Sequence, residues 1–567
     1  MNFASIALLA ALCSAPQNSL TPPSRGAPPL DLHVGAAADS AKPARGGSVV
    51  VATPSLPPSL NAMLESSGVA RQVLYEVHDS LLRRNWETWE LEPSLASAVE
   101  RTLDDKRLVL TFTLRENVRW HDGHPFDARD VLFSFECFRN PHVRCDRKRA
   151  AFEKIESASV LDDGRVRFVF SEPYFLAEAA FDETFTILPS HVYDLADSDN
   201  PRHAADAESL EQGKFVNDHG ANREWIGLGP YRVTSFATDR IVAQRFEGFH
   251  DAANAGWLDQ LSWRAFGDAN AAVAALLEGE VDFVDRLSIE DYFGERTENE
   301  RFTAAFGKGL VLTPSLSVTA WNLASPKLSD ARVRNALAHA ANWDAIRDGV
   351  YRGLALRVTG EQPAFAPHYD AALAPLAFDR ARAQSLLAQA GWIDRDGDGR
   401  VDREGTSLEI EYLYSSGASV SQQIAQALQA DWQAVGVGVR LATRDPAAFS
   451  EALRKREFEA AALTLASSYI SDPEPMWHSR WSKTVSANRW GLNDAQVDGL
   501  IASLQRELDP ASNRALFHRL QARVHQLQPC IFGLWAARRY ALSKRVRGVQ
   551  LFALDPGYSL RRWFVAE

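Results

Sequence analysis

The sequence predicts an α/β protein with more than one lobe. Its 567 residues, 46% of them hydrophobic, exceed the roughly 250–300 residues at which single cores stop growing. Residues 408–441 carry a strand, a helix and a second strand in succession, and residues 111–135 carry a strand, a tight turn and a capped helix. Because strand and helix periods alternate along the chain, we expect mixed β-sheets covered by helices.

Local signals define the elements of the N-terminal part. Ser48–Ala52 reads as a β-branched strand, and the apolar residues of Val69–Leu82 recur at helical spacing. Thr111–Leu114 is expected to be a short strand. Asp127, followed three residues later by Asp130, predicts the N-cap of the next helix.

The C-terminal half contains a βαβ unit. Leu408–Tyr414 and Val437–Leu441 are predicted strands, and Ser421–Val435 has apolar residues at helical spacing before Gly436. Trp432 lies on the apolar face of this helix. We therefore expect Trp432 in the core rather than against a ligand.

Residues 112–135, FTLRENVRWHDGHPFDARDVLFSF, closely resemble a motif of the cluster 5 solute-binding proteins of ABC importers, the dipeptide, oligopeptide and nickel binders. Further matches follow in the order of that family, at residues 188–193 (LPSHVY), 227–231 (GLGPY), 330–337 (DARVRNAL), 350–353 (VYRG) and 498–501 (DGLI) with Arg514. The resemblance implies a periplasmic-binding-protein-like type II fold. Such a fold has two large lobes with mixed β-sheets plus an inserted subdomain, joined by a two-strand hinge.

The same resemblance implies lobes that are discontinuous in sequence. We expect lobe I to contain residues 47–78, 223–311 and 530–567. Lobe II is then the inserted subdomain, residues 79–222, and lobe III contains residues 312–529. The crossings near residues 312–320 and 524–532 are expected to be the two hinge strands.

The N-terminus has features of an export signal. Residues 1–15 contain an apolar run too short to span a bilayer, and residues 16–46 form a Pro- and Ala-rich segment expected to be a disordered tether. The protein is then periplasmic or otherwise extracytoplasmic. Cys13 is a candidate lipid anchor, although Leu12 stands where lipoproteins prefer a small residue and no Lys or Arg precedes the apolar run.

Charge and cysteine content narrow the function further. A formal net charge of −12 without a dense basic stripe argues against a nucleic-acid partner. Four cysteines are too few for a disulfide scaffold. Cys137 and Cys145 either form a disulfide or remain two buried thiols, and Cys530 is expected in the core.

The motifs of common catalytic sites are missing. The sequence has no GxSxG, HExxH, Walker A, GxGxxG or CxxC pattern, so we expect neither an enzyme nor a cofactor. His121 and His124, which flank Asp122, are interpreted as part of a turn rather than a metal site. Residues 394–399, DRDGDG, resemble the start of an EF-hand loop, but Gly405 occupies the twelfth position in place of Glu, which favours a polar turn.

Residues 463–477, LTLASSYISDPEPMW, are the strongest candidate for a ligand-binding loop. In the peptide binders of the family this loop often reads D-x-x-[DE]-P, and its first Asp binds the N-terminal amine of the ligand. Asp472 matches the second acid, but Tyr469 occupies the position of the first. Asp472 therefore binds the amine, or the ligand is not a free peptide, or Asp472 only caps the following turn.

Further side chains are candidates for ligand contact. Ser467 and Ser468 can form hydrogen bonds with an extended peptide, and Trp477 either lines an apolar pocket or packs between lobes. The resemblance adds two pairs, Trp321 with Asn322 after the hinge strand and Ser66 with Ser67 on a lobe I loop.

The resemblance implies a solute-binding component of an ABC importer. We expect a monomer that captures an oligopeptide or peptide-like solute by hinge closure and delivers it to a permease and its ATPase. A non-peptide ligand such as a metal chelate, an opine or a glycan is an alternative, and so is a ligand-presenting sensor. In a nickel binder His478 is the histidine expected to be essential.

Overall fold

The computed structural model describes residues 42–566 except 66, 87, 105, 183, 224, 467–468, 484–487 and 555. Residues 1–41, with the predicted signal, Cys13 and most of the predicted tether, lie outside the described part. Within that part no helix combines the length and the apolar composition needed to cross a bilayer.

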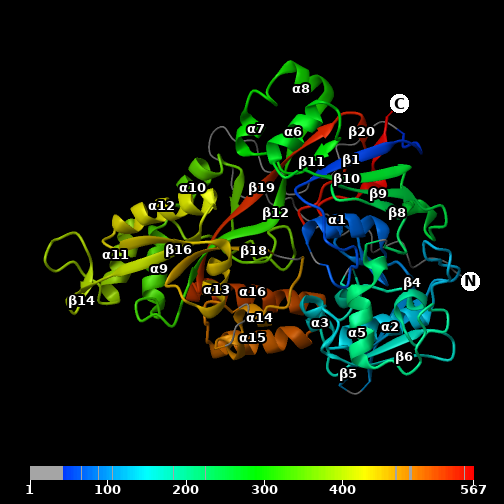
Figure 1. Cartoon of the computed structure of the whole chain (residues 1–567). Helices are drawn as coiled ribbons and strands as arrows, with labels where there is room; N and C mark the ends of the chain where they lie inside the picture. The colour runs from blue at the N-terminus through cyan, green and yellow to red at the C-terminus, as the bar shows by residue number, and fades with distance from the viewer. Residues whose placement is uncertain are drawn as a thin grey trace, which may run out of the picture.

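A mixed sheet of 11 strands runs through the molecule (Figure 1). Its order is β17-β16-β18-β12-β19-β11-β1-β10-β9-β8, with β13 paired to β19. The strands are β1 (Ser48–Thr53), β8 (Tyr231–Phe236), β9 (Arg240–Arg245), β10 (Gln260–Ala265), β11 (Phe283–Val284), β12 (Phe306–Trp321), β13 (Ala355–Arg357), β16 (Glu409–Ser415), β17 (Gly438–Arg444), β18 (Ala460–Ala466) and β19 (Cys530–Ser543).

Two long strands connect the halves of this sheet. β12 and β19 are antiparallel and pair from Phe306 opposite Ser543 to Ala320 opposite Cys530, with a register shift between Leu312 and Leu316. The strand expected at residues 524–532 is wrong in its first part, because α16 (Pro510–Leu527) continues to Leu527. Gln528, with φ 43°, ends that helix in the left-handed conformation.

The first helix is shorter than predicted. α1 (Gly68–Val77) ends where His78 adopts an extended conformation, and β2 (Leu82–Arg84) pairs with β3 (Leu91–Pro93). Leu81 and Leu82 are fully buried from this extended segment rather than from a helix. Apolar spacing continued past the true helix end, which explains the overestimate.

Residues 79–222 contain a separate four-stranded antiparallel sheet. Its order is β4 (Ala96–Asp104), β5 (Arg107–Leu114), β7 (Val166–Phe170) and β6 (Ile155–Val160), and α2 (Ala128–Arg139) and α5 (Ser209–Asp218) belong to the same unit. The predicted capping box is present, because Asp127 and Asp130 each accept a hydrogen bond from the backbone N–H at the other's position. A cluster of buried rings fills the core, namely Phe112, Phe135, Phe168, Phe181 and Phe185.

The βαβ unit is confirmed at the other end of the large sheet. β16 and β17 are parallel, and α12 (Ser419–Gln433) connects them. Trp432 is fully buried and donates a hydrogen bond to the carbonyl of Leu337 in α9 (Ala331–Ala340) at 2.9 Å. α10 (Trp343–Val350) and α11 (Arg380–Gln389) complete this core. The remaining large helices of this half are α13 (Pro446–Lys455) and α15 (Ala495–Arg506), with the short α14 (Glu474–Trp477) between them.

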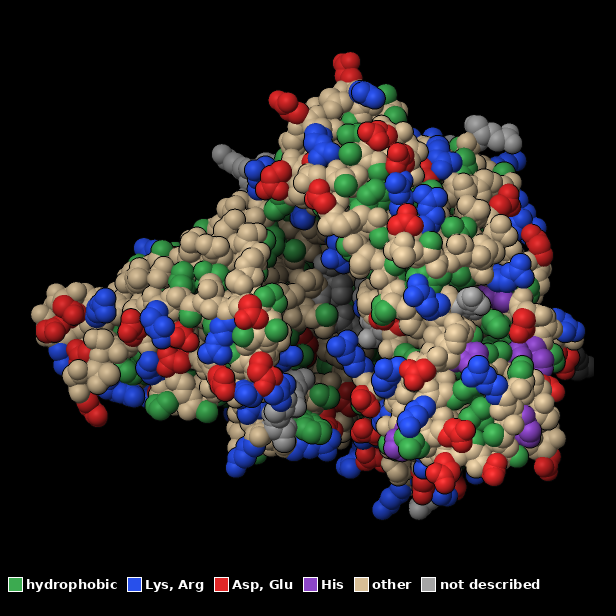
Figure 2. All heavy atoms as spheres, viewed as in Figure 1, with side chains coloured by type: hydrophobic (Ala, Val, Ile, Leu, Met, Phe, Trp, Pro, Cys, Tyr) green, Lys and Arg blue, Asp and Glu red, His purple; other side chains and the backbone are tan. Residues whose placement is uncertain are grey.

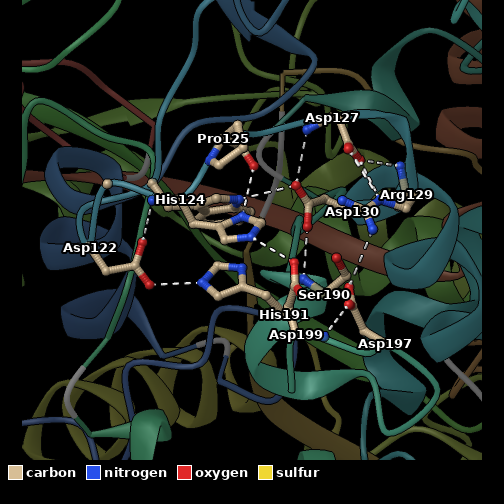
Figure 3. Close-up of polar contacts among 12 residues, drawn as sticks. Asp122, His124, Pro125, Asp127, Arg129, Asp130, Ser190, His191, Asp197 and Asp199 are labelled. Atoms are coloured by element: carbon tan, nitrogen blue, oxygen red, sulfur yellow. Dashed lines mark hydrogen bonds and ion pairs between the residues drawn. The ribbon is translucent and has the colours of Figure 1, made fainter. Parts of the chain in front are cut away.

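Residues of three sequence motifs, at 112–135, 227–231 and 188–193, lie close together where residues 79–222 join the rest of the chain. Nδ1 of His121 accepts a hydrogen bond from the N–H of Gly227 (3.0 Å), so Nε2 carries the proton and donates to the carbonyl of Gly229 (2.9 Å). A Cβ at Gly227 would lie 1.9 Å from the carbonyl oxygen of Val77, which explains the glycine. His191 of the third motif donates to Asp122 at 2.8 Å, beside the capped start of α2 (Figure 3).

This junction should be sensitive to acid. Burial lowers the pKa of His121 to about 4, against an ordinary value near 6.5. In the unfolded chain this histidine protonates near pH 6.5, whereas in the folded protein it stays neutral down to about pH 4. The contribution of neutral His121 to the free energy of unfolding is therefore complete above pH 6.5 and is lost as the pH falls from 6.5 towards 4. The loss between pH 7 and pH 5 is about 2 kcal/mol. Denaturant unfolding of the His121→Asn variant should therefore show a shallower loss of stability over this range than the wild type. The exposed His142→Asn serves as the control, and equal pH slopes for all three proteins would contradict the prediction.

Candidate functional site

A cavity of about 600 Å³ lies between segments that are distant in sequence. Its wall contains residues of α1 and the following strand, the end of β18 with Tyr469, and Arg561 near the C-terminus. The inserted segment adds Arg147, Lys148, Ala151, Asp182 and Thr184. A second space of about 210 Å³ adjoins it, and Arg84, Asp182 and Tyr469 line both. Figure 2 shows the molecule hollowed between its two halves. The larger volume is within the range of about 300–1,000 Å³ typical of pockets for small organic ligands.

Three aromatic side chains from separate units line this cavity, Tyr75, Trp86 and Tyr469, and further rings pack behind them. Tyr469 stacks on Trp89 with ring centroids 5.1 Å apart, and the guanidinium of Arg84 lies 5.4 Å from the centre of the Tyr469 ring. Trp86 donates a hydrogen bond to the hydroxyl of Tyr75 at 2.6 Å and stacks on Phe552. These rings offer flat apolar surface with polar edges, which suits an organic ligand that carries polar groups.

Two charged residues of the cavity lining, Arg561 and Asp79, have buried partners behind the wall. Arg561 and Glu76 form an ion pair at 3.4 Å, with side-chain exposures of 7% and 0%. Burial raises the pKa of Glu76 to about 7, although Arg561 acts in the opposite direction. Asp79 pairs with His250 at 3.1 Å; burial opposes its ionisation, but the hydrogen bond from His250 and the charge of Arg561 hold its pKa below the usual range.

Asp472 is engaged by protein groups. Its Oδ2 accepts hydrogen bonds from the hydroxyl of Tyr174 (3.0 Å) and from Nε2 of Gln505 (2.8 Å), and its Oδ1 accepts from the N–H of Glu474 (2.9 Å). Burial raises its pKa. Asp472 thus supports the turn before α14 and also joins the inserted unit, through Tyr174, to the C-terminal half.

Among the described residues predicted to contact ligand, only Tyr469 lines this cavity. Trp321 is fully buried against Trp432, and the amide of Asn322 donates to the carbonyls of Arg456 and Phe458. Trp477 is also fully buried and donates to Glu361 at 3.1 Å. The structure therefore places Trp321 and Trp477 in hydrophobic cores.

The predicted serines divide into two groups. Ser67 is exposed and is the N-cap of α1, where its hydroxyl accepts from the N–H of Ala70 at 3.3 Å. Ser66, Ser467 and Ser468 lie outside the described residues.

The sequence left alternatives open for the cysteines and for the acidic loop at residues 394–399. Cys137 and Cys145 are buried free thiols, and Cys530 is buried in a core. Asp394, Asp396 and Asp398 form an exposed acidic group, and Asp394 accepts from the N–H groups of Gly397 and Gly399 as in a polar turn. No other group of three metal-ligating side chains is close enough to bind one ion within the described chain.

His478 does not line the cavity. Its Nδ1 accepts from the N–H of Arg480 at 3.1 Å, next to Asp498. This places His478 in a local turn.

Sequence reasoning missed most of the cavity wall. Arg84 and Trp86 stand in the segment RRNWETW, where charged and aromatic residues alternate, and that composition was a usable signal. Lys148 and Arg561 come from distant parts of the chain and have no local signature.

Comparisons with known proteins agree on one family. Residues 90–487 match the bacterial extracellular solute-binding proteins, family 5. The chain is 22% identical to the oligopeptide-binding protein AppA of Bacillus subtilis over 93% of both sequences. The solved structure of that protein in complex with a nonapeptide has a TM-score of 0.72 at 20% identity, covering 93% of this chain and 100% of that one. NikA of Brucella suis, solved in complex with Fe(III)-EDTA, has a TM-score of 0.75 at 21% identity, covering 92% and 100%.

Proposed function

The chain belongs to the family 5 bacterial extracellular solute-binding proteins, and from this premise we propose that it captures an oligopeptide or peptide-like solute for an ABC importer. The observation that carries the proposal is the cavity of about 600 Å³ walled by all three expected lobes. The relatives of this chain are solute-binding proteins rather than enzymes. A relative named for oligopeptide binding, aligned over 93% of both chains, supports the peptide reading.

Capture would proceed by hinge closure. The three lobes would rotate about β12 and β19. Their proposed boundaries are 47–78, 223–311 and 530–567 for lobe I, 79–222 for lobe II and 312–529 for lobe III. Lobe II meets lobe III through the Tyr174–Asp472 hydrogen bond and the Arg506–Glu172 ion pair at 3.0 Å. A ligand that contacts both lobes favours the closed state because it binds that state more tightly.

The closed protein would then present its solute to a permease and its ATPase. The protein would act as a monomer outside the cytoplasm, exported through residues 1–15, with Cys13 as a candidate anchor. The extracellular assignment of its family supports this location.

Native mass spectrometry of protein purified without unfolding tests the proposal. We expect a bound mass, or a ladder of peptide masses, in the wild type. Ala466→Trp, which places an indole at the cavity wall, should lose it, whereas Ala98→Trp on the exposed face of β4 should retain it. An empty wild-type protein that pooled peptides also fail to stabilise against heat would contradict the proposal.

A further inference from the structure

The described residues of the cavity wall carry more cations than carboxylates, in an acidic protein. Among these described residues are three carboxylates, Glu65, Asp79 and Asp182, and six cations, namely Arg71, Arg83, Arg84, Arg147, Lys148 and Arg561. The whole chain carries a formal net charge of −12. Two of these cations pair with carboxylates outside the lining, Arg83 with Asp251 and Arg561 with Glu76, each at 3.4 Å. The excess of cations in the described lining still contrasts with the negative charge of the chain, and such a lining raises the local concentration of anions.

We infer that the solute is an acidic molecule whose carboxylate groups are bound by the cationic wall formed by Arg147, Lys148 and Arg561. This inference rests on the proposed function and specifies its ligand class.

The carboxylates of the lining already have protein partners. Asp79 accepts hydrogen bonds from His250, from the N–H of Ser80 and from the hydroxyl of Ser94. Asp182 pairs with Arg84 at 3.1 Å and accepts from the N–H of Thr184. Glu65 accepts a hydrogen bond from the N–H of Ser67 at 2.7 Å. Each of these three acids therefore already has a protein partner with which the amine of a ligand would have to compete.

Buried donors lie around Lys148 and Arg561, close to Asp79 and to Glu76, the ion-pair partner of Arg561. Lys148 donates to two neutral acceptors, the carbonyl of Ala62 and the hydroxyl of Thr186. Nη1 of Arg561 and both ring nitrogens of His78 are buried without a hydrogen-bond partner in the described part of the chain. Burial first, and then the positive charges of Lys148 and Arg561, lower the pKa of His78, which Asp79 only partly offsets. His78 is thus neutral and retains one N–H donor. Buried donors without acceptors are costly, so a ligand carboxylate would be favourable here.

Among the described residues, the lobe III face of the cavity supplies no acid. It contributes Ala466 and Tyr469, and the nearby Asp472 is held by Tyr174, Gln505 and the N–H of Glu474. The position where peptide binders resembling this protein carry an amine-binding Asp is therefore neutral. The strongest polar interaction between this cavity and its solute is then with an acidic group of the solute rather than with an amine.

Isothermal titration with charge-matched probes tests the inference. The probes are the peptide Ala-Glu-Ala-Glu as the free acid, its neutral counterpart Ala-Gln-Ala-Gln amide, and citrate as a tricarboxylate that is not a peptide. We expect an acidic probe to bind roughly tenfold or more tightly than the neutral peptide, because a hydrogen bond to a charged group contributes about that factor. Added salt should weaken the binding of the acidic probes more than that of the neutral one.

Two variants assign the effect to the wall. Lys148→Gln should weaken the acidic probe roughly tenfold and leave the neutral peptide within about twofold. Lys106→Gln removes one exposed cation from the same lobe, away from the cavity, and should change neither. Arg147→Gln, at an exposed position, provides a second wall variant if Lys148→Gln proves unstable.

The outcomes separate the two hypotheses. Equal or tighter binding of the neutral peptide, or equal losses for both charge classes in Lys148→Gln, would overturn the acidic-ligand inference and leave the solute-binding function standing. Binding of citrate without the acidic peptide would support the acidic class and contradict a peptide ligand. Failure of every probe, together with an empty cavity in native mass spectrometry, would contradict the proposed function itself.

Discussion

The Arg561→Met variant is expected to lose about 3–5 kcal/mol of the free energy of unfolding, the usual cost of removing one partner from a buried ion pair. Glu76 is fully buried, and Arg561 is the cation that pairs with it, at 3.4 Å. Arg561 also donates a hydrogen bond to the carbonyl of Tyr75 at 2.5 Å. The substitution removes both contacts and leaves a carboxylate whose pKa, already raised by burial to about 7, must rise further.

Chemical denaturation at neutral pH measures this loss. Arg562→Met, at the exposed neighbouring position, should change stability by no more than about 0.5 kcal/mol. The double variant Glu76→Gln with Arg561→Met should recover part of the loss, because no buried charge then lacks a partner. A loss below about 1 kcal/mol for Arg561→Met would show that water or another group compensates Glu76.

Trp477→Ala is expected to destabilise the protein by a similar amount, about 3–5 kcal/mol, the range for truncating a large core aromatic. Trp477 is fully buried and stacks on Trp490 with centroids 5.3 Å apart. Its indole N–H is the donor to Glu361, whose own pKa is raised by burial. The variant therefore combines a cavity with an unsatisfied buried acceptor.

The same variant distinguishes a core role from a ligand role for Trp477. Thermal unfolding should shift strongly, while the affinity of the folded fraction for solute should change little. Trp481→Ala, at a half-buried position where the indole donates to Glu474, is the matched control and should cost less. A large loss of affinity with unchanged stability would place Trp477 at the ligand.

Local patterns in the sequence predicted the fold well where short-range physics decides the structure. The capping box of Asp127 and Asp130 and the βαβ unit around Trp432 depend on residues within a few turns of each other, and both are present. The helix after Val69 was predicted too long, because apolar residues at helical spacing do not reveal where a chain becomes extended.

The site was harder to predict than the fold. Position in a family motif suggested Trp321 and Trp477, but the direction of a side chain depends on packing, and both point into cores. Arg84, Lys148 and Arg561 meet only after the chain has crossed between units several times. Tyr469, the departure from the motif, is the predicted residue that lines the cavity.

The register shift between β12 and β19 has a mechanical consequence. Between Leu312 and Leu316 one strand advances four residues while its partner advances two, from Ala537 to Trp535. A ladder interrupted in this way bends and twists more readily than a regular one. A second register shift follows between Ser317 and Val318. Flexure should therefore concentrate between Leu312 and Val318, so the halves of the molecule can rotate while the regular pairings outside this interval are kept. The ease with which the halves move is then set by a few peptide units next to the cavity, because Ser315 in this interval pairs with Ala466 of the cavity wall.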